Sequence, residues 1–316
     1  MKPGLLILGD SARMLERWRR AAQEALPQVD VLEGDALSPA QREQTRYALV
    51  WGQCGALLAT LPHLKLMISV GAGVDHLLDD PDTPPQLPLV RMVDPGLTRS
   101  MGDFVLLSAL MAVRNMPQIL ANQRLKRWEP VADLTPAHCP VGIMGLGELG
   151  EHAAKRLISQ GFPLRAWVRT PRSCAAEGME IYAGLESLDA FLRETKILIV
   201  LLPLTPATQR LIDRDLLAKL PRGATLINVA RGGLMVEAAV LAALDSGQLS
   251  SAFLDVFTQE PLPTHSPFWD HPRVIVTPHI ASVTQPESGI LAVKRAIDEF
   301  ESGQPLSHQV ARARGY

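Results

Sequence analysis

The stretch that decides the fold is Val141-Gly142-Ile143-Met144-Gly145-Leu146-Gly147-Glu148-Leu149-Gly150, which continues into a helical pattern over 151–159. Its four opening residues predict a buried strand, because short apolar runs that end at a glycine are typical of parallel sheets. Gly145 permits a tight turn after that strand, and Gly150 lets the following helix pack closely on it. The stretch therefore predicts a strand–turn–helix unit of a doubly wound sheet.

The same turn is suited to binding phosphate. Gly147 lets a phosphate approach the backbone, and the helix start, which includes Glu148 and Leu149, offers N–H groups that have no partner within the helix. A G-x-G-x-x-G pattern alone is weak evidence, since glycine-rich turns are common. Its place between a buried strand and a helix favours a dinucleotide site over a plain turn.

Short apolar strands alternate with helical stretches on both sides of this unit, which predicts the α/β class. We expect strands at 5–8, 29–32, 48–51, 66–70, 89–92, 164–168, 197–202, 225–229, 252–256 and 274–277. We also expect a helix over 101–113 that ends near Pro117, where proline disfavours continuation. The predicted architecture is two Rossmann-like parallel-sheet domains with an active-site cleft between them.

The last predicted helix, over 287–300, has no strand after it in the second series. It could cross back and pack on the first domain, which would make that domain discontinuous. We therefore expect a flavodoxin-like substrate (catalytic) domain over 1–100 plus 284–316. The dinucleotide-binding Rossmann domain is expected over 101–283.

Composition narrows the classes of partner. The 316 residues include 31 Lys+Arg and 33 Asp+Glu, a net charge of −2, so the basic excess typical of nucleic-acid binding is missing. Cys54, Cys139 and Cys174 lie far apart in no metal-ligand spacing, so we expect reduced thiols, no disulfide framework and no metal site. No apolar run approaches the roughly 20 residues of a membrane span. We expect a cytoplasmic protein with no membrane partner.

The second strand of the dinucleotide unit, 164–168, ends at Arg169, where units that bind NAD usually carry an acidic residue. Thr170, Arg172 and Ser173 follow, so two guanidinium groups and two hydroxyls could surround the 2′-phosphate of NADP, which arginine recognises in a forked geometry. Arg172 could instead be simply solvated. The pattern predicts NADPH as the preferred cofactor, with NADH possible.

Three later strands each deliver one polar residue just past the carboxyl end, where open parallel sheets bind ligands. These residues are Arg231, Glu260 and His279. Arg231 offers a planar fork to a carboxylate, and His279 is a natural proton donor to a carbonyl oxygen. A carboxylate at Glu260 would favour the charged imidazolium. Each residue taken singly could instead have a purely structural role, such as packing or turn formation. The occurrence of all three together favours a catalytic site.

Two loops of the first domain also follow strands. Trp51 ends one strand, and Val70-Gly71-Ala72-Gly73-Val74 ends another, where glycines let the backbone approach a small carboxylate. A tight turn is the structural alternative for these glycines, and core packing is the alternative for Trp51. Asp255 could orient a nicotinamide carboxamide.

Several motifs together resemble the D-isomer-specific 2-hydroxyacid dehydrogenase family, over nearly the whole chain. The matching motifs are 69–75 (SVGAGVD), 228–232 (NVARG), 254–263 (LDVFTQEPLP), 277–281 (TPHIA) and 312–316 (RARGY). The resemblance implies that Arg231 and His279 are the catalytic pair and that Glu260 is the partner of His279. It also implies that the amides of Gly71–Val74 hold a carboxylate, that Trp51 walls the pocket, and that the protein is a homodimer.

The remaining expected contacts follow from the same comparison. Trp269 is expected beside the substrate. Further cofactor contacts are expected from Leu202, Pro203, Ala230, Asp255 and Ser282.

The expected function is NADPH-dependent reduction of a small 2-oxoacid, either glyoxylate to glycolate or hydroxypyruvate to D-glycerate, with histidine as proton donor. Two alternatives remain open at this point. One is an NAD-dependent dehydrogenase of a larger D-2-hydroxy acid. The other is a nucleotide-sensing family member without catalysis.

Overall fold

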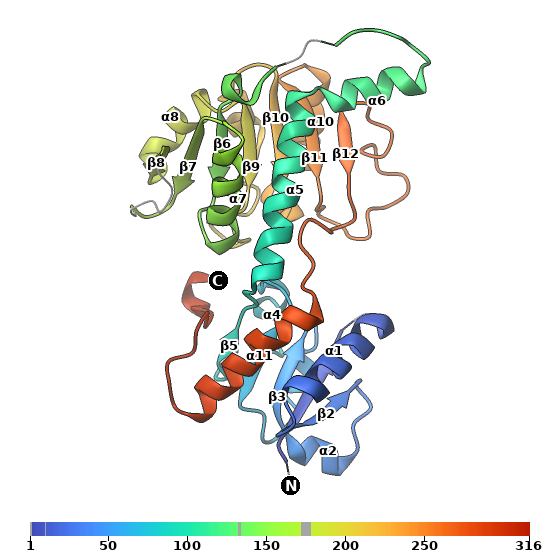
Figure 1. The fold of residues 1–316 in the computed structure, drawn as a ribbon, viewed down its shortest axis with the longest axis vertical. Coiled ribbons are helices and arrows are strands. Elements are labelled where there is room, and N and C mark those ends of the chain that lie inside the picture. The colour runs from blue at the N-terminus through green and yellow to red at the C-terminus, as the bar shows by residue number, and fades with distance from the viewer. Residues whose placement is uncertain (1, 10, 132–133, 172–177) are drawn as a thin grey trace. The chain divides into compact units, whose positions relative to one another are not determined.

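The structure is a computed structural model that describes residues 2–9, 11–131, 134–171 and 178–316. The chain divides into two compact units (Figure 1). Unit 1 comprises 1–97 and 283–316, and unit 2 comprises 98–282. The sequence had suggested boundaries at 100/101 and 283/284.

Unit 1 is built on a parallel sheet that contains, among its described residues, five strands in the order β2-β1-β3-β4-β5. The strands are β1 (Gly4–Leu8), β2 (Asp30–Glu33), β3 (Thr45–Val50), β4 (Leu66–Ser69) and β5 (Leu89–Val90). Its helices are α1 (Ala12–Ala25), α2 (Pro39–Gln44), α3 (Gly55–Leu58), α4 (Asp75–Leu78) and α11 (Pro286–Glu301). Gln309 adds an antiparallel bridge to Val90 at the β5 edge.

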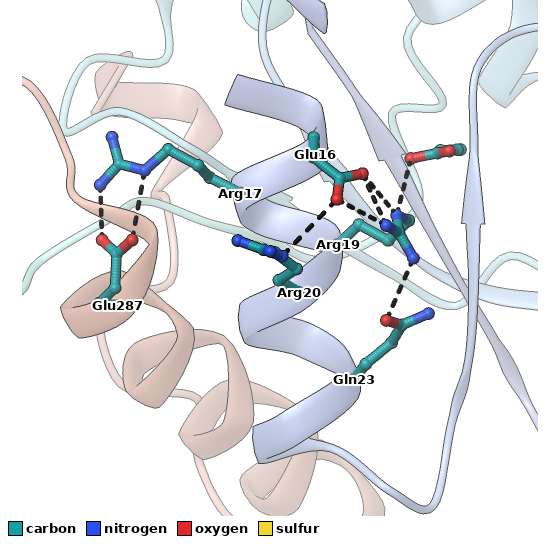
Figure 2. A network of polar contacts seen from close by, with 7 residues as sticks. Glu16, Arg17, Arg19, Arg20, Gln23 and Glu287 are labelled. Atoms are coloured by element: carbon teal, nitrogen blue, oxygen red, sulfur yellow. Dashed lines mark hydrogen bonds and ion pairs between the residues drawn. The ribbon is translucent and has the colours of Figure 1, made fainter. Parts of the chain in front are cut away.

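Helix α11 lies beside α1, although nearly the whole sequence separates them (Figure 1). Trp18 of α1 is buried against α11, where a Cβ on Gly289 would lie 2.7 Å from its ring. Figure 2 shows the polar part of this contact, in which Arg17 forms a 2.6 Å ion pair with Glu287. Exposed ion pairs contribute little, so the buried indole is the main support of the contact.

Unit 2 contains, in its described part, seven parallel strands in the order β12-β11-β10-β9-β6-β7-β8. The strands are β6 (Val141–Met144), β7 (Leu164–Val168), β8 (Met179–Ala183), β9 (Ile197–Val200), β10 (Ala224–Asn228), β11 (Leu249–Leu254) and β12 (Val274–Val276). Its helices are α5 (Pro95–Val113, which starts in unit 1), α6 (Met116–Arg124), α7 (Glu148–Ser159), α8 (Leu188–Arg193), α9 (Arg214–Ala218) and α10 (Glu237–Asp245). Strands β6 and β9 are neighbours in the sheet but not in sequence, which is the switch point at which such sheets bind ligands.

Both faces of the unit 2 sheet are buried, as a parallel sheet requires. Successive residues of each strand enter opposite clusters because side chains alternate across a strand. Met144, Leu198 and Leu226 lie in one cluster, and their neighbours Ile143, Ile199 and Ile227 lie in the other. The strand ends are thereby held at a fixed edge.

Among the described residues, α5 is the one helix that is long and apolar enough to cross a membrane by length and composition. Core helices of globular domains share these properties. Met101, Val105, Ala109 and Val113 repeat every four residues and pack into the unit 2 core.

The predicted α/β class is confirmed, with parallel sheets in both units. Two local features differ from expectation. Pro117 stands in the first turn of α6, where proline is well tolerated, so it starts a helix as well as following one. Strand β8 was not predicted, because its residues are partly exposed at the sheet edge and form no continuous apolar run. Cys54 and Cys139 are thiols that form no disulfide within the described residues, and Cys174 lies outside that part of the chain.

Core packing in unit 2 predicts the effect of removing Phe191, which is fully buried on α8. Phe191→Ala should lower the free energy of unfolding by about 3–5 kcal/mol through lost burial and a residual cavity. Leu185→Ala, at a side chain that is 75% exposed, is the control and should change it little. Denaturant unfolding of both variants measures this, and equal small losses would contradict the packing described.

Candidate active site

Three neighbouring strand ends of unit 2 carry the polar residues singled out from the sequence. Arg231 follows β10, Glu260 follows β11 and His279 follows β12. Because β10, β11 and β12 are adjacent and parallel, their carboxyl ends lie on one edge of the sheet.

His279 and Glu260 are in direct contact. The imidazole Nδ1 lies 2.7 Å from Glu260 Oε2, and about one third of each side chain is exposed. The other carboxylate oxygen, Oε1, accepts a 2.8 Å hydrogen bond from the backbone N–H of Phe257. Both oxygens of Glu260 are thus fixed, and the ring nitrogen that remains outside this pair is Nε2.

The environment of Glu260 keeps it ionised. Burial alone would raise the pKa of this carboxyl. The hydrogen bonds from His279 and from the Phe257 N–H, together with the charges of His279 and Arg231, outweigh burial, so the pKa lies below its ordinary value of 4.5.

Asp255 supports the backbone that carries His279. This buried carboxylate accepts hydrogen bonds from Thr277 Oγ1 at 2.6 Å, from the Ile280 N–H at 2.9 Å and from the Ala281 N–H at 2.8 Å. Its backbone carbonyl accepts the His279 N–H at 2.8 Å. His279 has a φ of 54°, a left-handed conformation that costs a non-glycine residue on the order of 1–3 kcal/mol, which these bonds offset.

This arrangement gives Asp255 a role that the sequence analysis did not anticipate. Both of its oxygens already accept hydrogen bonds within the loop that carries His279. The expected contact with a nicotinamide carboxamide therefore stays a prediction.

Arg231 is held by the turn after β10. The Asn228 side chain accepts the Ala230 N–H at 3.2 Å and donates to the Arg231 carbonyl at 3.0 Å. One guanidinium nitrogen of Arg231 donates to the Ala230 carbonyl at 2.8 Å. Gly232 then packs so closely that a Cβ there would lie 1.9 Å from the Phe257 carbonyl carbon. Only glycine fits at this position, which lets the segment of Arg231 approach the loop of Glu260.

The glycine-rich turn fits a dinucleotide. Gly145 has a φ of 101°, and a Cβ on Gly150 would lie 2.3 Å from the Gly145 carbonyl oxygen, so turn and helix need both glycines. At Gly147, in contrast, an added Cβ would meet no atom within 4 Å, and the start of α7 has no side-chain cap. Open space beside an uncapped helix start is what a phosphate requires.

The other expected cofactor residues lie after strands of the same sheet. Arg169 and Thr170 are exposed and follow β7, whereas Arg172 lies outside the described residues. Leu202 and Pro203 follow β9. Ala230 follows β10, and Ser282 follows β12. Trp269 is 46% exposed, and its Nε1 donates to the Pro263 carbonyl at 3.0 Å.

In unit 1, the loop after β4 is held firmly. The Gly71 N–H donates to Ser69 Oγ at 3.2 Å, and the Gly71 carbonyl accepts the Met92 N–H at 3.0 Å. The Val70 carbonyl accepts Thr284 Oγ1 at 2.7 Å. Within the described part of the chain, no acceptor is found for the N–H groups of the next three residues, 72–74. A fixed loop with available donors suits a small anion.

Trp51 packs on the same loop. A Cβ on Gly71 would lie 2.4 Å from the Trp51 ring, and the ring centroid of His76 lies 4.7 Å from that of Trp51. The sequence predicted roles for Trp51 and Gly71. It placed Ser69 within a matching motif without giving it a role, and it gave no signal for Thr284 or His76.

The chain was compared with known proteins. Residues 106–281 match the model of the family described as D-isomer specific 2-hydroxyacid dehydrogenase, NAD binding domain. Over 309 residues the chain is 44% identical to glyoxylate/hydroxypyruvate reductase A of Salmonella newport (strain SL254), covering 95% of this chain and 96% of that protein.

Solved structures are similar over the full length. A D-isomer specific 2-hydroxyacid dehydrogenase from Xanthobacter autotrophicus Py2, in complex with NADPH and MES, has a TM-score of 0.93 at 42% identity, covering 99% of this chain and 100% of that one. The NADPH-dependent glyoxylate/hydroxypyruvate reductase from Sinorhizobium meliloti, in complex with NADP and sulfate, has a TM-score of 0.90 at 39% identity, covering both chains fully. The resemblance seen in the sequence is confirmed.

The lowered pKa of Glu260 predicts a dependence of stability on pH. Between the lowered pKa of the folded carboxyl and the ordinary value of 4.5, the unfolded chain binds more protons than the folded chain, so the free energy of unfolding decreases as the pH is lowered. The stabilisation by ionised Glu260 is present above 4.5 and is lost as the pH falls through the folded pKa.

Denaturant unfolding from about pH 7 to about pH 3 checks this. Wild type should lose more stability over that range than Glu260→Gln, which cannot ionise. Equal losses in the two proteins would contradict the interaction.

Proposed function

Because the chain belongs to the D-isomer-specific 2-hydroxyacid dehydrogenase family, we propose that it reduces small 2-oxoacids with NADPH, converting glyoxylate to glycolate and hydroxypyruvate to D-glycerate. The observation that carries the proposal is the 2.7 Å pair of His279 and Glu260, with the charge of Arg231 acting on the same carboxylate. Relatives that are named for this activity match nearly the whole chain.

Arg231 binds the substrate carboxylate in this proposal. Its guanidinium presents parallel N–H donors that match two carboxylate oxygens. In unit 1, the N–H groups of residues 72–74 are the other candidate donors to a small carboxylate, and the loop that holds them is fixed by Ser69 and Met92. A substrate held at its carboxylate presents its carbonyl in one orientation, which lowers the entropic part of the barrier.

His279 donates the proton to the carbonyl oxygen. Its Nδ1 faces Glu260, so Nε2 is the atom that faces the substrate. The ionised Glu260 orients the ring through Nδ1, and the protonated ring is the form that can donate. NADPH, when bound, supplies the hydride that reduces the carbonyl carbon. The chain itself contributes position and electrostatics.

The cofactor would be held by residues of unit 2. The pyrophosphate fits the open position at Gly147 and the uncapped start of α7. Arg169 and Thr170, exposed after β7, would face the 2′-phosphate together with Arg172. Similar structures were solved with NADPH or NADP. The other residues predicted after β9, β10 and β12 would line the nicotinamide end.

Trp51 and Trp269 would limit the size of the substrate. The Trp51 ring rests on Gly71 and beside His76, so its position is defined. A rigid aromatic wall favours acids with two or three carbons over branched ones.

We also propose a homodimeric, cytoplasmic enzyme. Large apolar side chains of α5, α6 and the following segment face solvent, and the exposed fraction is 55% for Leu107, 60% for Leu125 and 100% for Trp128. A second copy of the chain would cover such a surface.

Initial rates of reduction of glyoxylate and of a branched 2-oxoacid, each measured with NADPH and with NADH, test the function. Purified protein should reduce glyoxylate with NADPH faster than with NADH, and faster than it reduces a branched 2-oxoacid. Higher rates with NADH and the branched acid would favour a dehydrogenase of larger acids. Binding of NADPH without turnover of any 2-oxoacid would favour a nucleotide sensor.

The assigned proton donor predicts distinct effects for two substitutions. His279→Ala should lower kcat by about 100-fold or more with a smaller change in KM, because general acid catalysis typically accelerates a reaction by a factor of about 10²–10⁴. Arg231→Ala should impair both kcat and KM, since it binds the carboxylate. Steady-state kinetics with glyoxylate measure both, and a wild-type rate in His279→Ala would overturn the assignment.

Cofactor preference is predicted to depend on Arg169. Arg169→Asp removes a cation and places a carboxylate where the 2′-phosphate is expected, so the ratio of kcat/KM for NADPH to that for NADH should fall at least tenfold. Arg193→Asp, elsewhere on the surface of unit 2, is the control with the same charge change. An unchanged ratio in Arg169→Asp would remove this residue from the cofactor site.

A further inference from the structure

Glu237, the first residue of α10, reaches the loop that carries Glu260. Its Oε1 accepts the backbone N–H of Thr258 at 2.8 Å. The preceding N–H, that of Phe257, donates to Glu260 Oε1 at the same distance. Two consecutive amides of one short loop are therefore each bound to a carboxylate, the first from within the loop and the second from outside it.

The external carboxylate comes from the segment that carries Arg231. That segment runs over 231–237 and contacts the loop in two places. Gly232 packs against the backbone of Phe257 and Thr258, and Glu237 binds the Thr258 N–H. Packing at Gly232 sets how closely the segment and the loop approach, whereas the directional bond from Glu237 fixes the orientation of the 257–258 peptide.

The segment is itself fixed on its other side. The Ile212 N–H donates to the Leu234 carbonyl at 2.9 Å, and the Val236 N–H donates to the Ile212 carbonyl at 2.9 Å. Glu237 therefore extends from a rigid base, so its carboxylate can act as an anchor.

We propose that Glu237 is a positioning residue that holds the Glu260 loop against the Arg231 segment and thereby keeps Glu260 in place on His279. The proposal rests on the proposed function, for which this pair provides the proton. A hydrogen bond to a carboxylate is roughly twice as strong as one between neutral groups. Without it, the loop would keep the contact with Gly232, the packing of Phe257 on Phe268 and its internal bond, and Glu260 could move away from the imidazole.

Kinetics with glyoxylate and NADPH test whether Glu237 acts through Glu260. Glu237→Ala should lower kcat about tenfold, with little change in the KM for NADPH, because displacements near 1 Å in catalytic groups cost up to about 100-fold. Glu237→Gln keeps an acceptor oxygen and should recover most of the rate.

A double-mutant cycle separates this role from a general loss of stability. In a Glu260→Ala background, Glu237→Ala should change kcat less than twofold, since the group that it positions is gone. The matched control is Glu299→Ala, which removes a carboxylate that binds the Ser307 N–H at 2.7 Å in unit 1 and should leave kcat unchanged. Equal losses from Glu237→Ala in both backgrounds would overturn the proposal.

Hydrogen exchange gives a readout that needs no activity. A peptide that contains Phe257 and Thr258 should exchange faster in Glu237→Ala and in Glu237→Gln than in wild type, in that order, and at the wild-type rate in Glu299→Ala. Unchanged exchange in Glu237→Ala would show that the anchor is not formed and would overturn the proposal. Faster exchange in a protein whose wild type reduces no 2-oxoacid would support the anchor and reject the proposed function.

Discussion

The contact between the Glu260 carboxylate and the His279 imidazole, 2.7 Å long, is the interaction on which the site depends. An imidazole at a strand end can act as an acid only if it is oriented toward the group that it protonates, and a carboxylate on Nδ1 fixes that orientation. Most of the polar structure at this edge serves that contact. Asp255 fixes the backbone of His279 through three hydrogen bonds, and the Phe257 N–H fixes the carboxylate.

The parallel sheet brings the residues of this site together. Strands β10, β11 and β12 are adjacent and parallel, so residues that are far apart in the chain reach one edge without long loops. Two backbone segments approach each other closely where there is no space for a side chain, as at Gly232 beside Phe257. The glycine-rich turn after β6 shows the same close backbone packing, with Gly150 against Gly145.

Sequence patterns predicted the parts that rest on local chemistry. The strands at 141–144 and 164–168 were predicted with their observed bounds, because each is a mainly apolar run, interrupted in the second only by Arg165, that ends at a residue unsuited to a buried strand. Strand β8 was missed because an edge strand does not need to be apolar throughout. Pro117 was interpreted only as a helix end, whereas the first turn of α6 accepts it.

The residues of the candidate site also fall into those that the sequence could predict and those that it could not. Arg231, Glu260 and His279 could be predicted because strand order implies a shared edge and their chemistry is complementary. The functions of Asp255 and Glu237 could not, since each depends on which backbone N–H groups the fold brings within reach. An acidic residue after a strand or at a helix start has many structural uses, and no spacing in the sequence distinguishes them.

The most direct test of this account is a crystal structure of the protein with NADPH and oxamate, an analogue of glyoxylate that is not reduced. We expect the oxamate carboxylate on the Arg231 guanidinium. We also expect the carbonyl oxygen within about 3.2 Å of His279 Nε2, while Nδ1 keeps its contact with Glu260. Oxamate bound away from the imidazole, or a His279 ring turned away from Glu260 in the complex, would contradict the central claim.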